Sequence, residues 1–374
     1  MTRPIAAAFI TAFLTVVRLS ATQAVSLDFI ADLQPGPHDV GFRLLIETDK
    51  TRPALPESSD ESGRVMPIAI WYPSARHEPR AARLRVDDYV RISAQALSGR
   101  SSDDGLSAFQ QRYGAADSDR LERLRQSPML AARDVAPERG RFPLVLFAHA
   151  APDSQSVMAE HLASHGFVVA AVRSRGTAEL AYRLSRENLD TMTADLAFAW
   201  ARLQREPYVR TGPAVFIGMS NGSIGSMAVQ LRAPRMVAGV VSLDGGIGED
   251  AGGTYLRERS NDDPRRLRAP LLHFYTEPNP RLNFAHVRSY EGADRTLVLV
   301  KGVRHTDFLN DALFDKFLTG DARAYRSAEG FVWVARYTLR FVQAVMSDRK
   351  GDWLEGGEPP PSEWVTIERL AGRL

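Results

Sequence analysis

The feature that most constrains this chain is a short apolar run that ends in a glycine-flanked serine. Ala214-Val-Phe-Ile217 is typical of a buried strand, Gly218-Met-Ser-Asn-Gly222 follows it, and helical apolar spacing comes next. This order predicts a strand, a sharp turn and a helix, with Ser220 at the tip of the turn. The two glycines would let the strand and the helix approach closely, so that the serine hydroxyl is held above the edge of a sheet.

Other apolar runs predict the sheet to which this strand belongs. Strands are predicted at 36–46, 64–73, 142–148, 166–172, 214–217, 237–243, 270–275 and 296–300. Helical spacing predicts helices at 154–164, at 189–203, after Ser220 and at 331–347. Strands that alternate with helices predict an α/β fold, with a mostly parallel central sheet and helices on both faces. The first two strands flank a polar link at 47–63 and are predicted to form an antiparallel pair.

Residues 74–140 are the least expected part of such a fold. Helical spacing at 83–97 and 121–132, separated by a polar loop at 98–105, predicts a helical insertion. This insertion would serve either as a lid over the site or as decoration, and the sequence favours neither. The tail at 351–374 is predicted to be a loosely packed extension with one short ordered piece.

The N-terminal residues have the pattern of a secretory signal peptide. Arg3 precedes an apolar run from Ile5 to Val17, and Thr22-Gln-Ala24 offers small residues for cleavage. We expect residues 1–24 to be removed and 25–374 to form one domain in an exported protein, periplasmic or secreted. An N-terminal anchor that is not cleaved is the alternative. The chain has no cysteine, so its stability must come from the core rather than from disulfides.

Charge and motif spacing argue against a nucleic-acid surface, a metal site and a nucleotide-binding loop. A net charge of only +2, with arginines interspersed among acids, is typical of solvated helix faces rather than a nucleic-acid surface. His161 and His165 lie four residues apart, but no third metal ligand is evident near them. The glycine pairs after 244 lack the strand-to-helix setting of a nucleotide loop. The sequence therefore predicts neither a metal nor a cofactor.

Three reactive residues follow predicted strands, where side chains collect at one edge of a parallel sheet. They are Ser220, Asp244 and His305, in chain order. A serine hydroxyl needs a nearby base, which an imidazole supplies, and the imidazole needs a carboxylate to orient it. Glu277, after the next strand, is a rival for the acid. Asp307 is too near His305 in sequence for that role and is expected to orient the loop.

The developing oxyanion also needs hydrogen-bond donors, and backbone N–H groups supply them. One would come from Asn221, directly after the nucleophile, and one from the loop after the 142–148 strand. Pro152 has no N–H, so Ala151 or Ala150 must provide the second donor.

Taken in order, these motifs resemble the platelet-activating-factor acetylhydrolase-like and dienelactone-hydrolase-like branch of the α/β-hydrolase family. The resemblance runs through the segments at 35–42, 70–74, 132–134, 141–149, 162–171, 218–222, 242–245 and 305–308. It implies an α/β-hydrolase fold, and it maps the acid to Asp244 and the oxyanion donors to Ala151 and Asn221. The chain departs from the family pattern at Ala150, where glycine is usual, and at Met219, where histidine is frequent.

Together these observations predict a serine hydrolase that cleaves carboxylic esters, with small or short-to-medium acyl groups, through an acyl-enzyme. The partner would be a small-molecule ester, and contact with a lipid surface is left open. An acyltransferase or a peptidase that uses the same triad is an alternative. A binding protein without catalytic activity, built on a hydrolase scaffold, is another.

Overall fold

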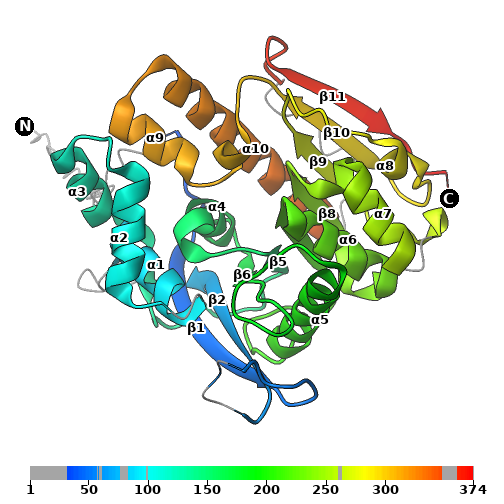
Figure 1. Ribbon diagram of the computed structural model, residues 1–374, viewed down its shortest axis with the longest axis horizontal. Helices are drawn as coiled ribbons and strands as arrows, with labels where there is room; N and C mark the ends of the chain where they lie inside the picture. The colour runs from blue at the N-terminus through cyan, green and yellow to red at the C-terminus, as the bar shows by residue number, and fades with distance from the viewer. Residues whose placement is uncertain are drawn as a thin grey trace, which may run out of the picture.

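An eleven-stranded sheet runs through the molecule, in the order β11-β10-β9-β8-β7-β5-β6-β2-β1-β4-β3 (Figure 1). The computed structural model describes residues 32–56, 58, 61–75, 83–97, 100–259, 263–347 and 360–373. The predicted signal peptide lies outside these residues. The strands are β1 Asp39–Asp49, β2 Arg64–Ser74, β3 Arg83–Arg85, β4 Pro128–Arg133, β5 Leu144–Ala148, β6 Val168–Val172, β7 Ala214–Met219, β8 Val237–Leu243, β9 Leu271–Tyr275, β10 Arg295–Val300 and β11 Val365–Leu370.

The helices connect these strands and cover the sheet. They are α1 Val86–Ile92, α2 Ser102–Tyr113, α3 Ser118–Gln126, α4 Pro152–Ser164, α5 Arg186–Leu203, α6 Asn221–Arg232, α7 Asp250–Arg259, α8 Ala285–Ser289, α9 Asp311–Thr319 and α10 Ala322–Met346. Short 3-10 turns at Gly246–Gly248 (η3) and His305–Phe308 (η5) follow β8 and β10. Within the described ranges, no helix has both the length and the apolar character needed to cross a membrane.

The six central strands, β6, β5, β7, β8, β9 and β10, are all parallel to one another. β1 and β2 form the antiparallel pair that the sequence predicts, with Val40 opposite Pro73. The predicted parallel sheet and N-terminal antiparallel pair are therefore confirmed. The carboxyl ends of the parallel strands meet at one edge, which is where the candidate residues lie.

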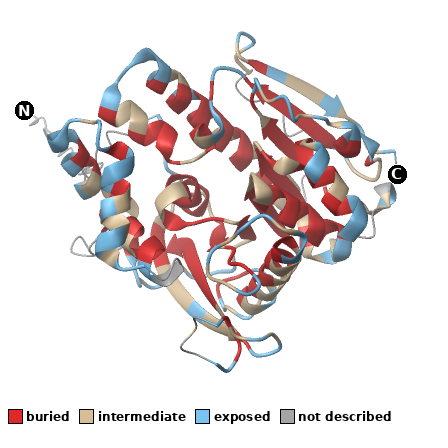
Figure 2. Cartoon of the chain, viewed as in Figure 1, coloured by how far each residue is buried: buried red, intermediate tan, exposed pale blue. Residues whose placement is uncertain are grey.

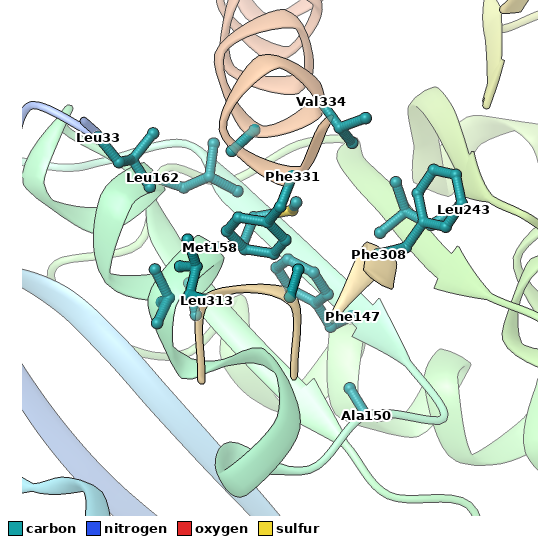
Figure 3. Packing of buried hydrophobic residues seen from close by; sticks show 14 of the residues in the cluster. Leu33, Phe147, Ala150, Met158, Leu162, Leu243, Phe308, Leu313, Phe331 and Val334 are labelled. Atoms are coloured by element: carbon teal, nitrogen blue, oxygen red, sulfur yellow. The ribbon is translucent and has the colours of Figure 1, made fainter. Parts of the chain in front are cut away.

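Alternating side chains of each central strand pack on opposite faces of the sheet, as the strand geometry requires. In β5, Leu146 contacts the cluster beneath α5, α6 and α7, whereas Phe147 contacts the one beneath α4, α9 and α10. Figure 3 shows Phe147 among Met158 of α4, Leu313 of α9 and Phe331 of α10. Figure 2 shows the central strands buried along their length, so helices cover both faces as predicted.

Several predicted boundaries are wrong. The helix expected at 83–97 begins only at Val86, because Arg83–Arg85 forms the strand β3 and pairs with β4. The helix expected at 121–132 ends at Gln126, and β4 occupies 128–133, pairing with β1 and β3. The loop expected at 98–105 gives way to α2 from Ser102. The last helix begins at Ala322 rather than at 331, capped by the Asp321 carboxylate, which accepts the Ala324 N–H at 2.8 Å. Short apolar runs fit both helix and strand, so pairing with β1 decides the case of β4.

The tail contains an ordered piece, as predicted, and that piece is the edge strand β11. It pairs antiparallel with β10, Val365 lying opposite Val300. Just before it, the Trp364 carbonyl accepts the Lys301 N–H at 2.8 Å. The Arg326 guanidinium lies 3.5 Å from the centre of the Trp364 ring, which adds a cation–π contact. These contacts fix the tail to the strand that leads to His305.

One buried carboxylate joins the insertion to the central fold. Glu160 of α4 has no exposed surface and accepts hydrogen bonds from the Tyr89 hydroxyl and from the N–H groups of Leu130 and Ala131, at 2.8 and 3.2 Å. These donors come from α1 and β4, so the insertion is attached through this side chain. Burial raises the pKa of Glu160 to about 7, even though all three hydrogen bonds favour the charged form.

We expect Glu160 to make the stability of the fold depend on pH. The folded protein holds this proton more tightly than the unfolded chain, whose glutamate pKa is 4.5, so the stabilisation is complete below pH 4.5 and lost as pH rises through about 7. The loss is on the order of 3 kcal/mol in the free energy of unfolding. Urea denaturation between pH 4.5 and 8 measures it. Glu160→Gln should lack this component, whereas exposed Glu122→Gln should keep it; equal pH profiles for Glu160→Gln and wild type would contradict the assignment.

Candidate active site

The nucleophile candidate lies on a strained turn between β7 and α6. Ser220 has a φ of 51° and a ψ of −121°, a conformation that costs about 1–3 kcal/mol in a residue with a side chain. The turn is tight because of its glycines. A Cβ at Gly218 would lie 2.2 Å from the Gly222 carbonyl carbon, and one at Gly222 would lie 2.3 Å from the Ala148 oxygen. Larger residues at either position would push the strand and the helix apart.

Backbone strain gathers at one edge of the sheet. Among the described residues, four that are not glycine have positive φ, and three of them, His149, Ser220 and Asp244, directly follow β5, β7 and β8. These three strands are neighbours in the sheet. Strained backbone that clusters in this way is characteristic of functional sites.

Asp244 and His305 are in direct contact at this edge. His305 Nδ1 lies 2.6 Å from Asp244 Oδ2, and Asp244 Oδ1 accepts the Thr276 N–H at 3.2 Å. The Asp244 side chain is 7% exposed and the His305 side chain 48%. Because Nδ1 donates to the carboxylate, the neutral ring keeps its lone pair on Nε2, the nitrogen that can accept a proton.

Ser220 is tied by its backbone to the loop that carries Asp244. Its N–H donates to the Leu243 carbonyl at 3.2 Å, and its own carbonyl accepts the Gly246 N–H at 3.0 Å. Its hydroxyl has no hydrogen-bond partner within the described residues. The structure thus joins Asp244 to His305 directly and Ser220 to their loop, without a bond between Ser220 and His305. Such bonds often form only when substrate binds.

The two other acids occupy different surroundings. Glu277 is exposed, and nothing in the described part of the chain joins it to His305. Asp307 is 2% exposed and accepts hydrogen bonds from the Arg304 N–H at 2.7 Å and from the Ser327 hydroxyl at 2.6 Å. Asp307 therefore anchors the His305 turn to α10. The sequence predicts this orienting role for Asp307 but not its partner Ser327, which lies 20 residues away.

Two backbone N–H groups, those of Asn221 and Ala151, are the candidate oxyanion donors from the sequence. The Asn221 N–H begins α6 and so has no acceptor inside the helix. In the loop after β5, the Ala150 N–H donates to the Val172 carbonyl at 3.2 Å. The Ala151 N–H has no acceptor among the described residues. The sequence left Ala150 and Ala151 open as the second donor. Because the Ala150 N–H is already bonded, the Ala151 N–H is the one available to bind a substrate oxygen.

The loop after β5 has space for Ala150, which stands where glycine is usual in the family that the sequence resembles. The Ala150 methyl group is buried and belongs to the same cluster as Phe147, and Figure 3 shows it on the loop below that residue. Before it, the His149 ring lies 4.6 Å from that of Tyr182, centre to centre. Burial, and then the positive charge of Arg173, lowers the pKa of His149 to about 4. His149 is therefore neutral near pH 7 and adds no charge to the loop.

Two cavities lie in this part of the molecule, one at the start of α6 and one at the start of α4. One, of about 350 Å³, is lined by Asn221 and by residues of α5, α6 and α7. The other, of about 280 Å³, lies between α1, α2 and the start of α4, with Arg112, Asp153 and Arg173 in its wall. The insertion thus faces a cavity, while its role as a lid stays a prediction.

The described residues contain no group of three His, Asp or Glu side chains arranged to hold a metal ion. The rings of His161 and His165 lie 4.5 Å apart, and His165 Nδ1 bonds to the His161 carbonyl at 2.8 Å. Burial lowers the pKa of His161 to about 3, which keeps its ring neutral. This pair is part of the packing of α4.

Comparison with known proteins identifies the fold. No protein-family profile and no curated protein matches the sequence. Among solved structures, a ferulic acid esterase from Streptomyces cinnamoneus matches with a TM-score of 0.64 and 18% identity, over 89% of this chain and 98% of that one. A puromycin hydrolase matches with a TM-score of 0.43 and 14% identity, over 81% of this chain and 39% of that one. We conclude that the chain has an α/β-hydrolase fold.

Proposed function

We propose that the protein is a serine hydrolase that cleaves carboxylic esters through an acyl-enzyme. The observation that carries the proposal is the 2.6 Å contact between His305 and Asp244, beside a serine on a strained strand-to-helix turn. A surface histidine has no reason to lie against a nearly buried carboxylate at the edge where the sheet presents a serine. A nucleophile, a base and an orienting acid account for all three features.

Each residue has a defined role in this mechanism. Ser220 Oγ attacks the ester carbonyl carbon while His305 Nε2 takes its proton, and the proton then passes to the departing alcohol oxygen. Water, deprotonated by the same nitrogen, then attacks the acyl carbon. The bond from that carbon to Ser220 Oγ breaks, Oγ takes the proton back from His305, and the acid is released. Asp244 holds the ring in its productive tautomer and stabilises the imidazolium. The N–H groups of Asn221 and Ala151 stabilise the oxyanion, each lowering the barrier by about 2.7–4 kcal/mol.

The proposed substrates are esters with small or short-to-medium acyl groups. The structural neighbour named as a ferulic acid esterase supports the inclusion of aromatic acyl groups, such as feruloyl, in a first panel. The resemblance to acetylhydrolase-like and dienelactone-hydrolase-like enzymes favours acetyl esters and lactones. We propose an ester as the physiological substrate class, and the panel decides between these acyl types.

Labelling with a fluorophosphonate tests the proposal directly. The reagent phosphonylates a serine only when a base activates it, and peptide mapping should locate the label on Ser220. The rate at which the protein hydrolyses p-nitrophenyl esters, methyl ferulate and lactones should fall in proportion to the fraction of Ser220 that is labelled. Absence of both labelling and hydrolysis would favour a binding protein on this scaffold.

Transfer or peptide cleavage by the same residues would give a different result. Ser220 would be labelled, but added alcohols or amines would capture the acyl group in place of water, or peptides would be cleaved faster than esters. Product analysis by mass spectrometry separates these outcomes.

A further inference from the structure

We propose that the cavity beside Asn221 is the acyl pocket of the enzyme and takes an apolar acyl group of medium length. This inference rests on the proposed hydrolase function and deepens it. The cavity of about 350 Å³ lies between α5, α6, α7 and the turn η3. It adjoins both the proposed oxyanion donor Asn221 and Gly246, whose N–H bonds to the Ser220 carbonyl at 3.0 Å. A group attached to the reacting carbonyl would reach it directly.

The wall of the cavity is suited to an apolar ligand. Leu184, Leu189 and Ile224 form part of it. Leu184 is 59% exposed, one of the largest exposures of a large hydrophobic residue in the described chain. An exposed leucine beside an apolar cavity gains a favourable environment when an apolar ligand covers it. Leu184 is therefore placed to close over the far end of an acyl chain.

The charged and hydroxyl groups around the cavity already have partners within the protein. Glu249 pairs with Arg281 at 3.1 Å, Arg186 pairs with Glu258 at 2.7 Å, and the Tyr255 hydroxyl bonds to Asp190 at 3.0 Å. A charged ligand would have to compete with these contacts. An apolar group requires none of them to break, which favours a hydrocarbon or aromatic acyl group over a charged one.

The position of His305 decides which half of the ester enters the cavity. The alcohol oxygen must leave beside His305, because it receives its proton from that ring. Within the described residues, the cavity wall contains no residue of the 302–309 loop, and every lining element follows β6, β7 or β8. The alcohol therefore lies on the β10 side and the acyl group on the Asn221 side.

The size of the cavity sets the length of the acyl group. At about 30 Å³ for a water-sized group, 350 Å³ holds roughly ten to twelve non-hydrogen atoms. Each added methylene should raise kcat/KM about fourfold while it enters the cavity. With p-nitrophenyl esters, we expect kcat/KM to rise from acetyl to about octanoyl or decanoyl and then to level off.

A variant that fills the cavity tests the inference. Ala251 lines the cavity in the first turn of α7 and is exposed, so Ala251→Trp should fold normally. We expect it to lower the ratio of kcat/KM for octanoyl over acetyl esters at least tenfold. Ala322→Trp, at an exposed alanine in the first turn of α10, is the matched control and should leave the ratio unchanged.

A second pair of variants tests the edge of the cavity. Leu184→Asp should lower the same ratio, whereas Ile46→Asp should not, although Ile46 is equally exposed at 57% against 59%. A series of acetate esters with methyl to octyl alcohols should respond to neither Ala251→Trp nor Leu184→Asp. If the alcohol series changes and the acyl series does not, the cavity holds the leaving group and the proposal is overturned.

Binding measurements separate this inference from the proposed activity. On a Ser220→Ala background, calorimetry with p-nitrophenyl octanoate should give a Kd that rises at least tenfold with Ala251→Trp and stays constant with Ala322→Trp. A Kd independent of Ala251 overturns the pocket assignment whatever the activity. If binding depends on Ala251 but the wild-type protein hydrolyses no ester, the pocket assignment is supported and the proposed hydrolase function is rejected.

Discussion

Replacing Ser220 by alanine should lower kcat for p-nitrophenyl acetate by about 10⁴–10⁶-fold, the largest effect expected of any substitution in this chain. Without the hydroxyl no acyl-enzyme forms, and His305 has no nucleophile to activate. The remaining N–H groups of the oxyanion site would give only slow attack by water. The fold should be unchanged, because the Ser220 hydroxyl makes no hydrogen bond among the described residues.

Initial rates and thermal denaturation of both proteins provide the measurement. Ser226→Ala is a matched control, since it removes a hydroxyl from the helix that follows Ser220. There the Ser226 hydroxyl donates to the Gly222 carbonyl at 3.0 Å. Its rate should stay within a few fold of wild type. Residual activity above one part in a hundred in Ser220→Ala, with the protein freshly purified, would exclude Ser220 as the nucleophile.

Changing Asp244 to asparagine should lower kcat by about 10⁴-fold with little effect on stability. The amide keeps the shape of the carboxylate but favours a ring whose Nδ1 accepts a hydrogen bond, so Nε2 carries the hydrogen and no longer acts as a base. Because Asp244 is 7% exposed and bonded to both His305 and Thr276, no nearby group replaces it. The defect should appear in kcat rather than in KM.

The rival acid supplies the matched control. Glu277→Gln should leave kcat within about twofold of wild type, because this residue is exposed and makes no contact with His305 in the described structure. If Glu277→Gln were the more damaging change, the triad acid would be Glu277, after β9, rather than Asp244, after β8. The contact between Asp244 and His305 would then not be the one used in catalysis.

The sequence is sufficient to predict the centre of the sheet and the chain positions of the candidate residues. A strand buried on both faces is apolar throughout, as Leu144–Ala148 and Val168–Val172 are, so such strands are visible without any partner. Reactive residues directly after these strands must meet at one edge. The contact between Asp244 and His305, 61 residues apart, follows from that rule.

Features that depend on distant partners were harder to predict. β4 is too short and mixed to be distinguished from the end of a helix until β1 pairs with it. The start of α10 at Ala322 has charged residues among small ones and becomes helical through its cap and its packing on α9. Glu160 resembles any exposed helical glutamate in sequence, because only the fold brings Tyr89 and β4 to it.

The pairing of β10 with β11 has a consequence for synthesis of the protein on the ribosome. Val300 and Val365 lie opposite each other but about 65 residues apart in the chain. At roughly 5–20 residues per second, translation separates their emergence by about 3–13 s. During that interval the strand that leads to His305 has an open edge and lacks the contact between Lys301 and Trp364. If Ser220 and His305 act together as proposed, the nascent chain presents the serine before the strand that leads to His305 has gained its last neighbour.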